Sequence, residues 1–497
     1  MATDTLLIIG TAVVICALYF YVLYPACFSP LAHIPSPHWS CAVSNFWILR
    51  VRNKGTENST LYDAHCRLGN VIRVAPNTLS INGADAVRTV YQGGTRSPLG
   101  ILCLTATVPC IFSTIGSKEH SRRKRMITHI YSKSYIQSSE AIKGQIRAIV
   151  YGRLLPILYQ DASASKSYGT EVESIFMATA MDLVSAYIFG LQNGTNFLQD
   201  EPYRTHWLKL YLSRLNHHFW PQELPWFTSL CSRLGLRLYP SAVDGANNEL
   251  RDWNYRLCGN AHKTLMAGSS DCEKPEDEPI VFKALHSGIE KENKTEGKDS
   301  LIYKTSVLHK DEAVASEIFD HLLAGHENAG VALTYLTWHL SQSPSLQEKL
   351  REELFTLVTV DASGDDILPD CEALNSLPVL NCMVMETLRV HAPIAGPLPR
   401  DTPYPSCNID GHEIPGGVRV AAFAHALHLD ETVFPEAKNW DHTRWIGYES
   451  PNERQKEMSR QFWAFGSGGR MCVGSHFALN GQYSPDLIHR DPELTKW

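Results

Sequence analysis

Hydrophobic residues are unevenly distributed along the chain, and their first long run lies at the N-terminus. Residues 6–24 contain no charged side chain. These nineteen residues would span about 28 Å as a helix, close to the thickness of the hydrocarbon core of a bilayer. A cleaved signal peptide is the alternative, but the segment before the run carries only Asp4 and no basic residue. We therefore expect residues 1–28 to form an uncleaved membrane anchor.

Prolines follow this run at short intervals, at Pro25, Pro30, Pro35 and Pro37. Proline lacks the N–H group that a helix interior needs, and its ring clashes with the preceding turn. We expect these residues to end the N-terminal helix and to form a stiff, extended lead-in to the body of the protein.

Short apolar segments that suit β-strands occur in two parts of the chain. Residues 71–75 and 78–81 flank Pro76 and Asn77, which favour a turn, so the pattern predicts a hairpin. Residues 392–400 are expected to form an extended stretch, and residues 409–417 a turn between short strands. Residues 418–426 are expected to form a buried strand.

Most of the remaining pattern is helical. Residues 134–265 are expected to form helices broken by loops, with residues 171–188 as one of them. A long amphipathic helix is predicted from about residue 311 to residue 341, and another helix at residues 381–390. Residues 270–300 are rich in Glu, Lys and Asp, and they predict an exposed connection.

Composition and charge narrow the class of protein. Hydrophobic residues make up 44% of the chain and charged residues 20%, which is ordinary for a globular protein. The net charge of -7 argues against a general nucleic-acid binder. The 13 cysteines include no CxxC pair and indicate reduced thiols in a protein that faces the cytosol. The glycosylation sequons at Asn58, Asn193 and Asn293 are therefore expected to remain unmodified.

The most specific chemical signal lies near the C-terminus, in residues 463–474. This segment has one cysteine, Cys472, with glycines on both sides, and a short apolar helix is expected directly after it at residues 475–479. A thiolate at Cys472 would be stabilised by the N–H groups of the loop and by the N-terminus of this helix. Such a thiolate can ligate iron. The alternative is a glycine-rich turn around an ordinary buried cysteine.

The spacing within this loop resembles the cysteine-ligand loop of the cytochrome P450 family. The positions that carry the resemblance are Phe465, Gly468, Arg470, Cys472 and Gly474. The resemblance covers roughly residues 30–479, and it implies a mainly α-helical fold with a small β-rich subdomain, preceded here by a transmembrane helix. Residues 29–497 would then form the catalytic domain. The implied cofactor is haem b (iron protoporphyrin IX), with Cys472 as the ligand of the metal.

Further cofactor-binding residues follow from the resemblance. His120 and Lys124 lie four residues apart at a basic helix start, so they share one helix face. The resemblance implies that they and Arg400 meet the haem propionates, and that this helix offers a surface to a reductase. The tryptophan/arginine pair that is usual in this helix of the family is absent. A solvated basic face, or a patch for an acidic partner, is the alternative.

A structural network is implied by a second motif. Glu386 and Arg389 lie on one helix face at a spacing of three residues. Together with Arg444 they correspond to a buried family network that braces the cysteine loop. A surface ion pair of little energetic value is the alternative. His442 stands where proline is more usual.

The predicted central helix contains Gly325 and Gly330, each of which costs about 1 kcal/mol relative to alanine in a helix. Tight helix packing or close approach to a flat cofactor explains such glycines, and the resemblance favours the cofactor. Glu327 and Asn328 are the predicted catalytic residues. Glu327 keeps the acid of the family's proton relay, whereas Asn328 replaces threonine. We expect Asn328 to order a water that substitutes for the hydroxyl; chemistry that needs no protonation is the alternative.

The resemblance as a whole implies a haem-thiolate monooxygenase that inserts one oxygen atom of dioxygen into an apolar small molecule, in the manner of fungal microsomal enzymes of secondary metabolism. The implied partners are NADPH-cytochrome P450 reductase, the substrate and the membrane, with no nucleic acid. The implied location is the endoplasmic reticulum membrane, single-pass, with the catalytic domain facing the cytosol. A haem-thiolate isomerase or dehydratase that needs no reductase, or an inactive haem-fold protein, is the alternative.

The C-terminal segment departs from the family pattern. Only 25 of the 497 residues follow Cys472, where family members continue as a long helix and a hairpin. The match stops at Leu479, and residues 480–485 are expected to break any helix. We expect the chain to be truncated or altered after about residue 479, by retained intron sequence or a gene-model error, and its activity to be impaired.

Overall fold

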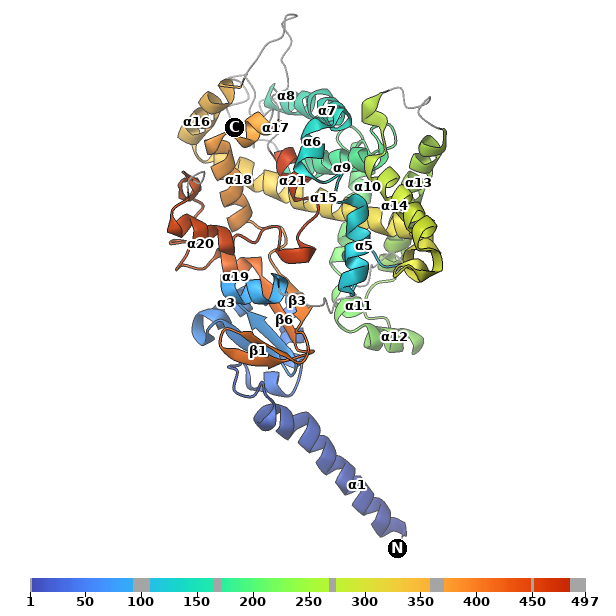
Figure 1. Ribbon diagram of the computed structural model, residues 1–497, viewed down its shortest axis with the longest axis vertical. Helices are drawn as coiled ribbons and strands as arrows, with labels where there is room; N and C mark the ends of the chain where they lie inside the picture. The colour runs from blue at the N-terminus through green and yellow to red at the C-terminus, as the bar shows by residue number, and fades with distance from the viewer. Residues whose placement is uncertain are drawn as a thin grey trace, which may run out of the picture.

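The computed structural model describes residues 2–92, 108–163, 171–267, 274–357, 371–447 and 451–482. Figure 1 shows a large helical part, a smaller part that contains the sheet, and one N-terminal helix that projects from the sheet end. The protein is therefore mostly helical with small β-sheets, as predicted. The α-helices are α1 (Ala2–Leu18), α2 (Phe46–Asn53), α3 (Glu57–Leu68), α4 (Ala84–Val87), α5 (Ser117–Ile127), α6 (Lys133–Ser138), α7 (Glu140–Ile146), α8 (Leu155–Ser163), α9 (Glu173–Phe189), α10 (Glu201–Leu215), α11 (Phe219–Glu223), α12 (Pro225–Arg233), α13 (Ala242–Ala267), α14 (Ile280–Thr295), α15 (Lys310–Ser341), α16 (Pro344–Phe355), α17 (Cys371–Asn375), α18 (Pro378–Val390), α19 (Ala424–His428), α20 (Glu453–Gln461) and α21 (Ser475–Gln482).

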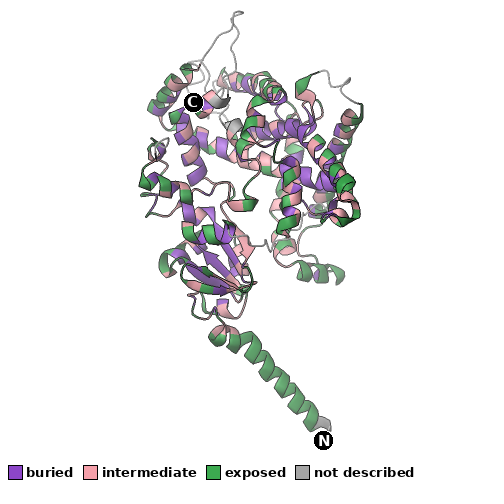
Figure 2. Cartoon of the chain, in the orientation of Figure 1, coloured by how far each residue is buried: buried purple, intermediate pink, exposed green. Residues whose placement is uncertain are grey.

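The N-terminal helix is longer than its prolines suggest. Helix α1 continues without a break as the π-helix η1 (Tyr19–Phe28), which contains Pro25. The prediction that Pro25 ends the helix is therefore wrong, because a change of helical register accommodates the interruption. The apolar helix spans Asp4–Phe28 and is long and apolar enough to cross a membrane, and none of it is buried within the protein. Figure 2 shows this helix exposed over most of its length.

Arg73 fastens the lead-in after this helix to the sheet. Its guanidinium is buried and donates to the carbonyl oxygens of Pro25 (2.8 Å), Leu31 (3.4 Å), Ala42 (3.3 Å) and Pro76 (2.8 Å). The lead-in contains turns and the short helix η2 (Trp39–Ala42) instead of the stiff extended chain that was predicted. Hydrogen bonds to one side chain thus hold it against the body.

The sheet is assembled from segments that lie far apart in the sequence. Its order is β1 (Val71–Ala75), β2 (Thr78–Ile81), β6 (Arg419–Phe423) and β3 (Pro397–Asp401). β1 and β2 form the predicted antiparallel hairpin, with Val71 opposite Ile81, while β2 and β6 are parallel. A second hairpin pairs β4 (Ser406–Ile409) with β5 (His412–Pro415). The predicted strand at residues 418–426 ends at Phe423, because the alanine-containing segment that follows forms helix α19.

The predicted exposed connection at residues 270–300 is wrong where the structure describes it. Helix α14 occupies Ile280–Thr295, and its apolar residues are buried in the main core. The charged residues that suggested a loop lie mainly on the other side of this helix. The local excess of charge obscured an amphipathic helix, whose buried apolar residues recur at helical spacing.

Helices α9 and α15 lie at the centre of the helical part (Figure 1). Helix α9 buries nearly every residue from Ile175 to Phe189. A Cβ atom on Gly325 would lie 2.6 Å from Val184 Cγ2, and one on Gly330 would lie 2.6 Å from Met177 Sδ. Both glycines therefore let α15 approach α9 closely. Tight packing explains them, and the prediction that they face a flat cofactor is wrong.

Candidate active site around Cys472

The backbone of the cysteine loop is shaped by glycine and by one internal hydrogen bond. Gly468 has φ +71°, and a Cβ atom there would lie 2.0 Å from the carbonyl oxygen of Tyr91. Glycine is therefore required both for the conformation and for the space. The N–H group of Cys472 donates to the carbonyl oxygen of Phe465 at 3.0 Å, which closes the loop. Gly474 has only Cys472 Sγ and Tyr131 Cε1 near its added Cβ position, both at 4.0 Å.

The thiol of Cys472 is exposed by surface area, yet protein atoms surround it on most sides. This burial raises the pKa of Cys472, while the N–H group of Gly474 and the charge of Lys124 lower it to a smaller extent. The N–H group of Gly474 thus acts on the thiol in the expected direction, although burial has the larger effect. A metal ion bound to the sulfur would stabilise its thiolate form.

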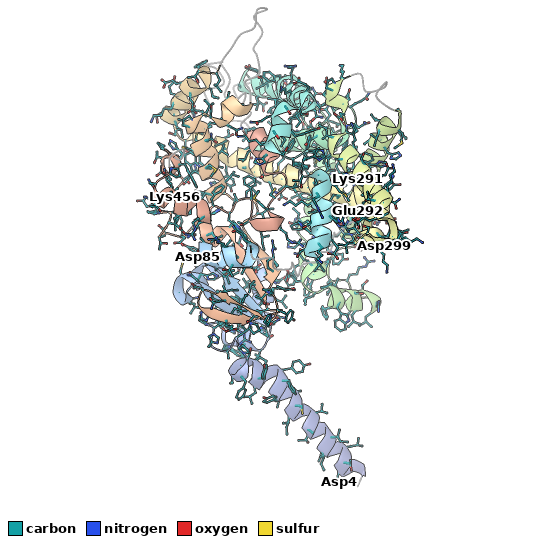
Figure 3. The ribbon with its side chains drawn as sticks, viewed as in Figure 1. Asp4, Asp85, Lys291, Glu292, Asp299 and Lys456 are labelled. Carbon is teal, nitrogen blue, oxygen red and sulfur yellow. The ribbon has the colours of Figure 1, made fainter. Side chains whose placement is uncertain are left out.

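The basic residues of helix α5 have two different sets of partners. Arg122 pairs with Glu292 (3.4 Å) and with Glu296 (2.7 Å) at the end of α14, and Figure 3 labels Glu292 beside α5. Lys124 turns to the cysteine loop, where its Nζ donates to the carbonyl oxygens of Gly469 (3.1 Å) and Met471 (2.8 Å). The helix is thus more than a solvated basic face, since part of it contacts the loop.

Arg470 and Arg400 complete a group of cations beside this helix. Arg470 donates to the carbonyl oxygens of Thr114 (2.7 Å) and Ile115 (2.9 Å), and Arg400 lies over the ring of Tyr91 at 4.7 Å. Within the described ranges, neither arginine forms an ion pair with a carboxylate. Burial lowers the pKa of Arg470 to about 10, with Arg400 contributing.

His120 lies within the electrostatic field of the same group. Burial lowers the pKa of His120 to about 4, and the charges of Arg470, Lys124 and Arg400 lower it further. His120 is therefore neutral at pH 7. We define the cation group as Lys124, Arg400 and Arg470, with the neutral ring of His120 beside them. Its mutual repulsion, with no carboxylate partner for either arginine, suits an anionic ligand, so these side chains fit the two carboxylates of a haem.

The two predicted catalytic residues point in different directions from helix α15. Asn328 donates from its amide to the carbonyl oxygen of Ala324 at 2.9 Å, and Ala324 is exposed. Glu327 turns to helix α10, where its Oε2 accepts a hydrogen bond from the hydroxyl of Tyr211. The structure therefore does not bring the acid and the amide together.

The predicted network around Glu386 is compact and buried. Arg389 binds both carboxylate oxygens of Glu386, at 2.8 and 2.7 Å, and Arg444 Nε lies 3.2 Å from Oε1. Glu386 and Arg389 have fully buried side chains, so a surface ion pair is excluded. Trp445 Nε1 also donates to Oε2 of Glu386, at 2.9 Å, and the N–H group of Asp441 donates to Oε1 at 2.9 Å. Each oxygen of the buried Glu386 carboxylate therefore accepts at least two hydrogen bonds.

The connection from this network to the cysteine loop is His428, which sequence reasoning missed. Its Nε2 accepts from the N–H group of Trp463 at 2.8 Å, at the start of the loop. Burial lowers the pKa of His428 to about 3, so the ring is neutral. Tyr211 was missed as well. Neither residue lies in a motif, and only the folded structure brings each to its partner.

Residues 36–480 match the model of the family described as Cytochrome P450. The chain is 26% identical over 446 residues to cytochrome P450 monooxygenase avaI of Aspergillus versicolor, covering 87% of this chain and 97% of that protein. It is 25% identical over 467 residues to cytochrome P450 monooxygenase orf2 of Aspergillus niger, covering 92% and 85%. It is 27% identical over 484 residues to cytochrome P450 monooxygenase FGM1 of Gibberella zeae, covering 94% and 86%.

Proposed function

Because the chain belongs to the cytochrome P450 family, we propose that it is a haem-thiolate monooxygenase acting on an apolar small molecule of secondary metabolism. The general monooxygenase role is supported by its curated relatives, which are fungal cytochrome P450 monooxygenases. The observation that supports the proposal is the placement of Cys472 beside the cation group, because a haem requires a thiolate ligand and cations that, among the described residues, have no carboxylate partner.

In this proposal Cys472 ligates the haem iron, and the cation group holds the two propionates. The bound haem b would supply the activation of dioxygen, with electrons from NADPH-cytochrome P450 reductase. Lys124 fixes the loop through the carbonyl oxygens of Gly469 and Met471. The Glu386 network and His428 brace the start of the same loop, so the position of the sulfur does not depend on flexible contacts.

Asn328 takes the part of a water-ordering residue. Its amide nitrogen is engaged by Ala324, which leaves Oδ1 free to accept from a water on the exposed side of α15. Glu327 supplies the proton. An isomerase or dehydratase that needs no electrons is the second candidate, because an amide relays protons less readily than a hydroxyl.

We also propose an anchored enzyme at the endoplasmic reticulum membrane, with residues 1–28 as the anchor and residues 29–497 as the catalytic domain facing the cytosol. Helix α12 and the turn after it add apolar side chains that would enter the lipid surface. Trp226 is 76% exposed and Leu234 68% exposed. These residues lie on the side of the lead-in, since Arg52 of α2 pairs with Glu223 of α11 at 2.9 Å. An apolar substrate dissolved in the bilayer would then be close at hand.

Two measurements test the proposed reaction. The reduced carbon monoxide difference spectrum of Cys472→Ser should lose the thiolate-type band, whereas Cys66→Ser, which replaces an exposed cysteine elsewhere, should keep it. Turnover is then measured with and without reductase and NADPH. Undiminished product without an electron donor would establish the isomerase or dehydratase instead, and a full-height band in Cys472→Ser would refute the ligand assignment.

A further inference from the structure

The face of helix α10 that meets α15 is built from residues at helical spacing. Trp207, Tyr211 and Arg214 follow one another at intervals of four and three residues and share this face. Trp207 packs edge-on to the ring of His326 at 5.2 Å, and Arg214 lies over the ring of Phe319 at 5.4 Å. Tyr211 stands between these two contacts.

The hydroxyl of Tyr211 donates to Glu327 Oε2. Burial raises the pKa of Tyr211, and the neighbouring carboxylate of Glu327 raises it further, so the hydroxyl stays protonated and the carboxylate accepts. Tyr211 is 5% exposed. A buried hydrogen bond to a charged group is stronger than an ordinary one, so it fixes the direction of the Glu327 side chain.

This contact directs the carboxylate of Glu327 toward α10. Consecutive helical residues lie about 100° apart around the axis, and Asn328 is bonded along its own side to Ala324. As long as Tyr211 holds Glu327, the acid faces α10. Proton delivery on the Asn328 side then requires the carboxylate to leave Tyr211.

We infer that Tyr211 is a positioning residue that couples the acid Glu327 to the position of helix α10. The inference rests on the proposed monooxygenase function and adds a way in which the protein regulates proton delivery by Glu327. With α10 in place, Glu327 is held back; when α10 shifts, the carboxylate is released toward Asn328. The use of oxygen is thereby linked to the position of helix α10, which contacts Glu327 of α15.

The test combines Tyr211→Phe with Glu327→Gln and with the double variant. Tyr203→Phe is the matched control, because it removes a hydroxyl from the same helix that contacts Trp253 instead of Glu327. The first readout is amide hydrogen exchange of residues 201–215 in the haem-loaded protein, which requires no turnover. Exchange in Tyr211→Phe should be about tenfold faster than in the parent. It should be no faster in the double variant than in Glu327→Gln alone.

The second readout is consumption of NADPH with reductase and without substrate. Tyr211→Phe should raise this rate severalfold, and the increase should disappear in the Glu327→Gln background. Tyr203→Phe should have the same effect in both backgrounds. Equal effects of Tyr211→Phe in the two backgrounds, or no effect on exchange, would overturn the inference. A parent protein without any NADPH turnover would refute the proposed function, while the exchange data would still decide on the contact.

Discussion

His428 and Arg389 bond to each other in both directions. The imidazole Nδ1 of His428 donates to the carbonyl oxygen of Arg389 at 2.8 Å, and the guanidinium of Arg389 donates to the carbonyl oxygen of His428 at 2.8 Å. Because Nδ1 is a donor and Nε2 accepts from Trp463, the ring is the neutral tautomer with its proton on Nδ1. A second proton would remove the acceptor that holds the start of the cysteine loop.

This relationship predicts acid sensitivity. The unfolded chain binds a proton at His428 near the ordinary pKa of about 6.5, whereas burial lowers the pKa of His428 to about 3 in the folded protein. The unfolded state therefore gains protons first as the pH falls. The contribution of His428 to the free energy of unfolding is full above about pH 6.5 and declines toward about pH 3, by up to about 1.4 kcal/mol per pH unit.

Urea denaturation of the parent and of His428→Gln from pH 7 to pH 5 measures this effect. The variant should be less stable at pH 7 but should lose stability less steeply with falling pH. The other buried histidines are present in both proteins, so the difference in slope isolates His428. Parallel slopes would show that His428 does not resist protonation in the folded state.

A second prediction concerns the contact between α9 and α15. Gly325→Ala should lower the free energy of unfolding by about 1–3 kcal/mol, because the new Cβ would overlap Val184. Gly259→Ala is the control. Gly259 lies within helix α13 and has nothing within 4 Å of its added Cβ, so alanine should stabilise by about 0.5–1 kcal/mol. Thermal or urea unfolding of both variants measures these changes. An equal change in the free energy of unfolding at both sites would contradict the tight packing of Gly325.

A third prediction tests the cation group. Lys124→Gln should release haem about tenfold faster than the parent, because the bonds of Lys124 to the loop carbonyl oxygens are lost, together with the positive charge that we propose for a propionate. Arg122→Gln removes a charge two residues away whose partners are Glu292 and Glu296, so haem release should be unchanged. Transfer of haem to apomyoglobin measures both rates. Equal release from the two variants would contradict the assignment of Lys124.

A fourth prediction concerns the membrane. Removal of residues 1–28 should leave a residual affinity for phospholipid vesicles, because Trp226 and Leu234 remain exposed. Replacing both by glutamine in the shortened protein should abolish vesicle sedimentation. Replacing the exposed apolar residues Phe355 and Ile446, which lie in other parts of the fold, should not. Loss of sedimentation on removal of residues 1–28 alone would assign membrane binding to the anchor only.

Sequence patterns predicted the features that depend on local spacing. The hairpin of β1 and β2, the long central helix and the contact of Glu386 with Arg389 are all readable from neighbouring residues. Patterns failed where a distant segment decided the outcome. The sequence around Gly325 favoured a nearby cofactor, whereas the structure packs α9 against this glycine. No local sequence signal predicts the hydrogen bond between His428 and Trp463.

Charge density also misled where apolar residues were spaced along a helix, as in α14. The sequence also did not indicate how far the thiol of Cys472 is buried. This burial raises the pKa of the thiol by more than the loop lowers it. The predicted alteration of the C-terminus after about residue 479 falls mostly on residues 483–497, which lie outside the described part. The preceding helix α21 continues to Gln482, three residues beyond the expected end at Leu479.

The bonds of Arg73 link the proposed membrane anchor to the body of the protein. One rigid, planar group binds both the end of the N-terminal helix, at Pro25, and the edge of the sheet, at Pro76. The end of the helix is therefore bonded directly to the sheet and is not connected to it by the lead-in alone. A bilayer that aligns the helix would orient the whole enzyme with it, so that a molecule diffusing in the lipid would always meet the same face.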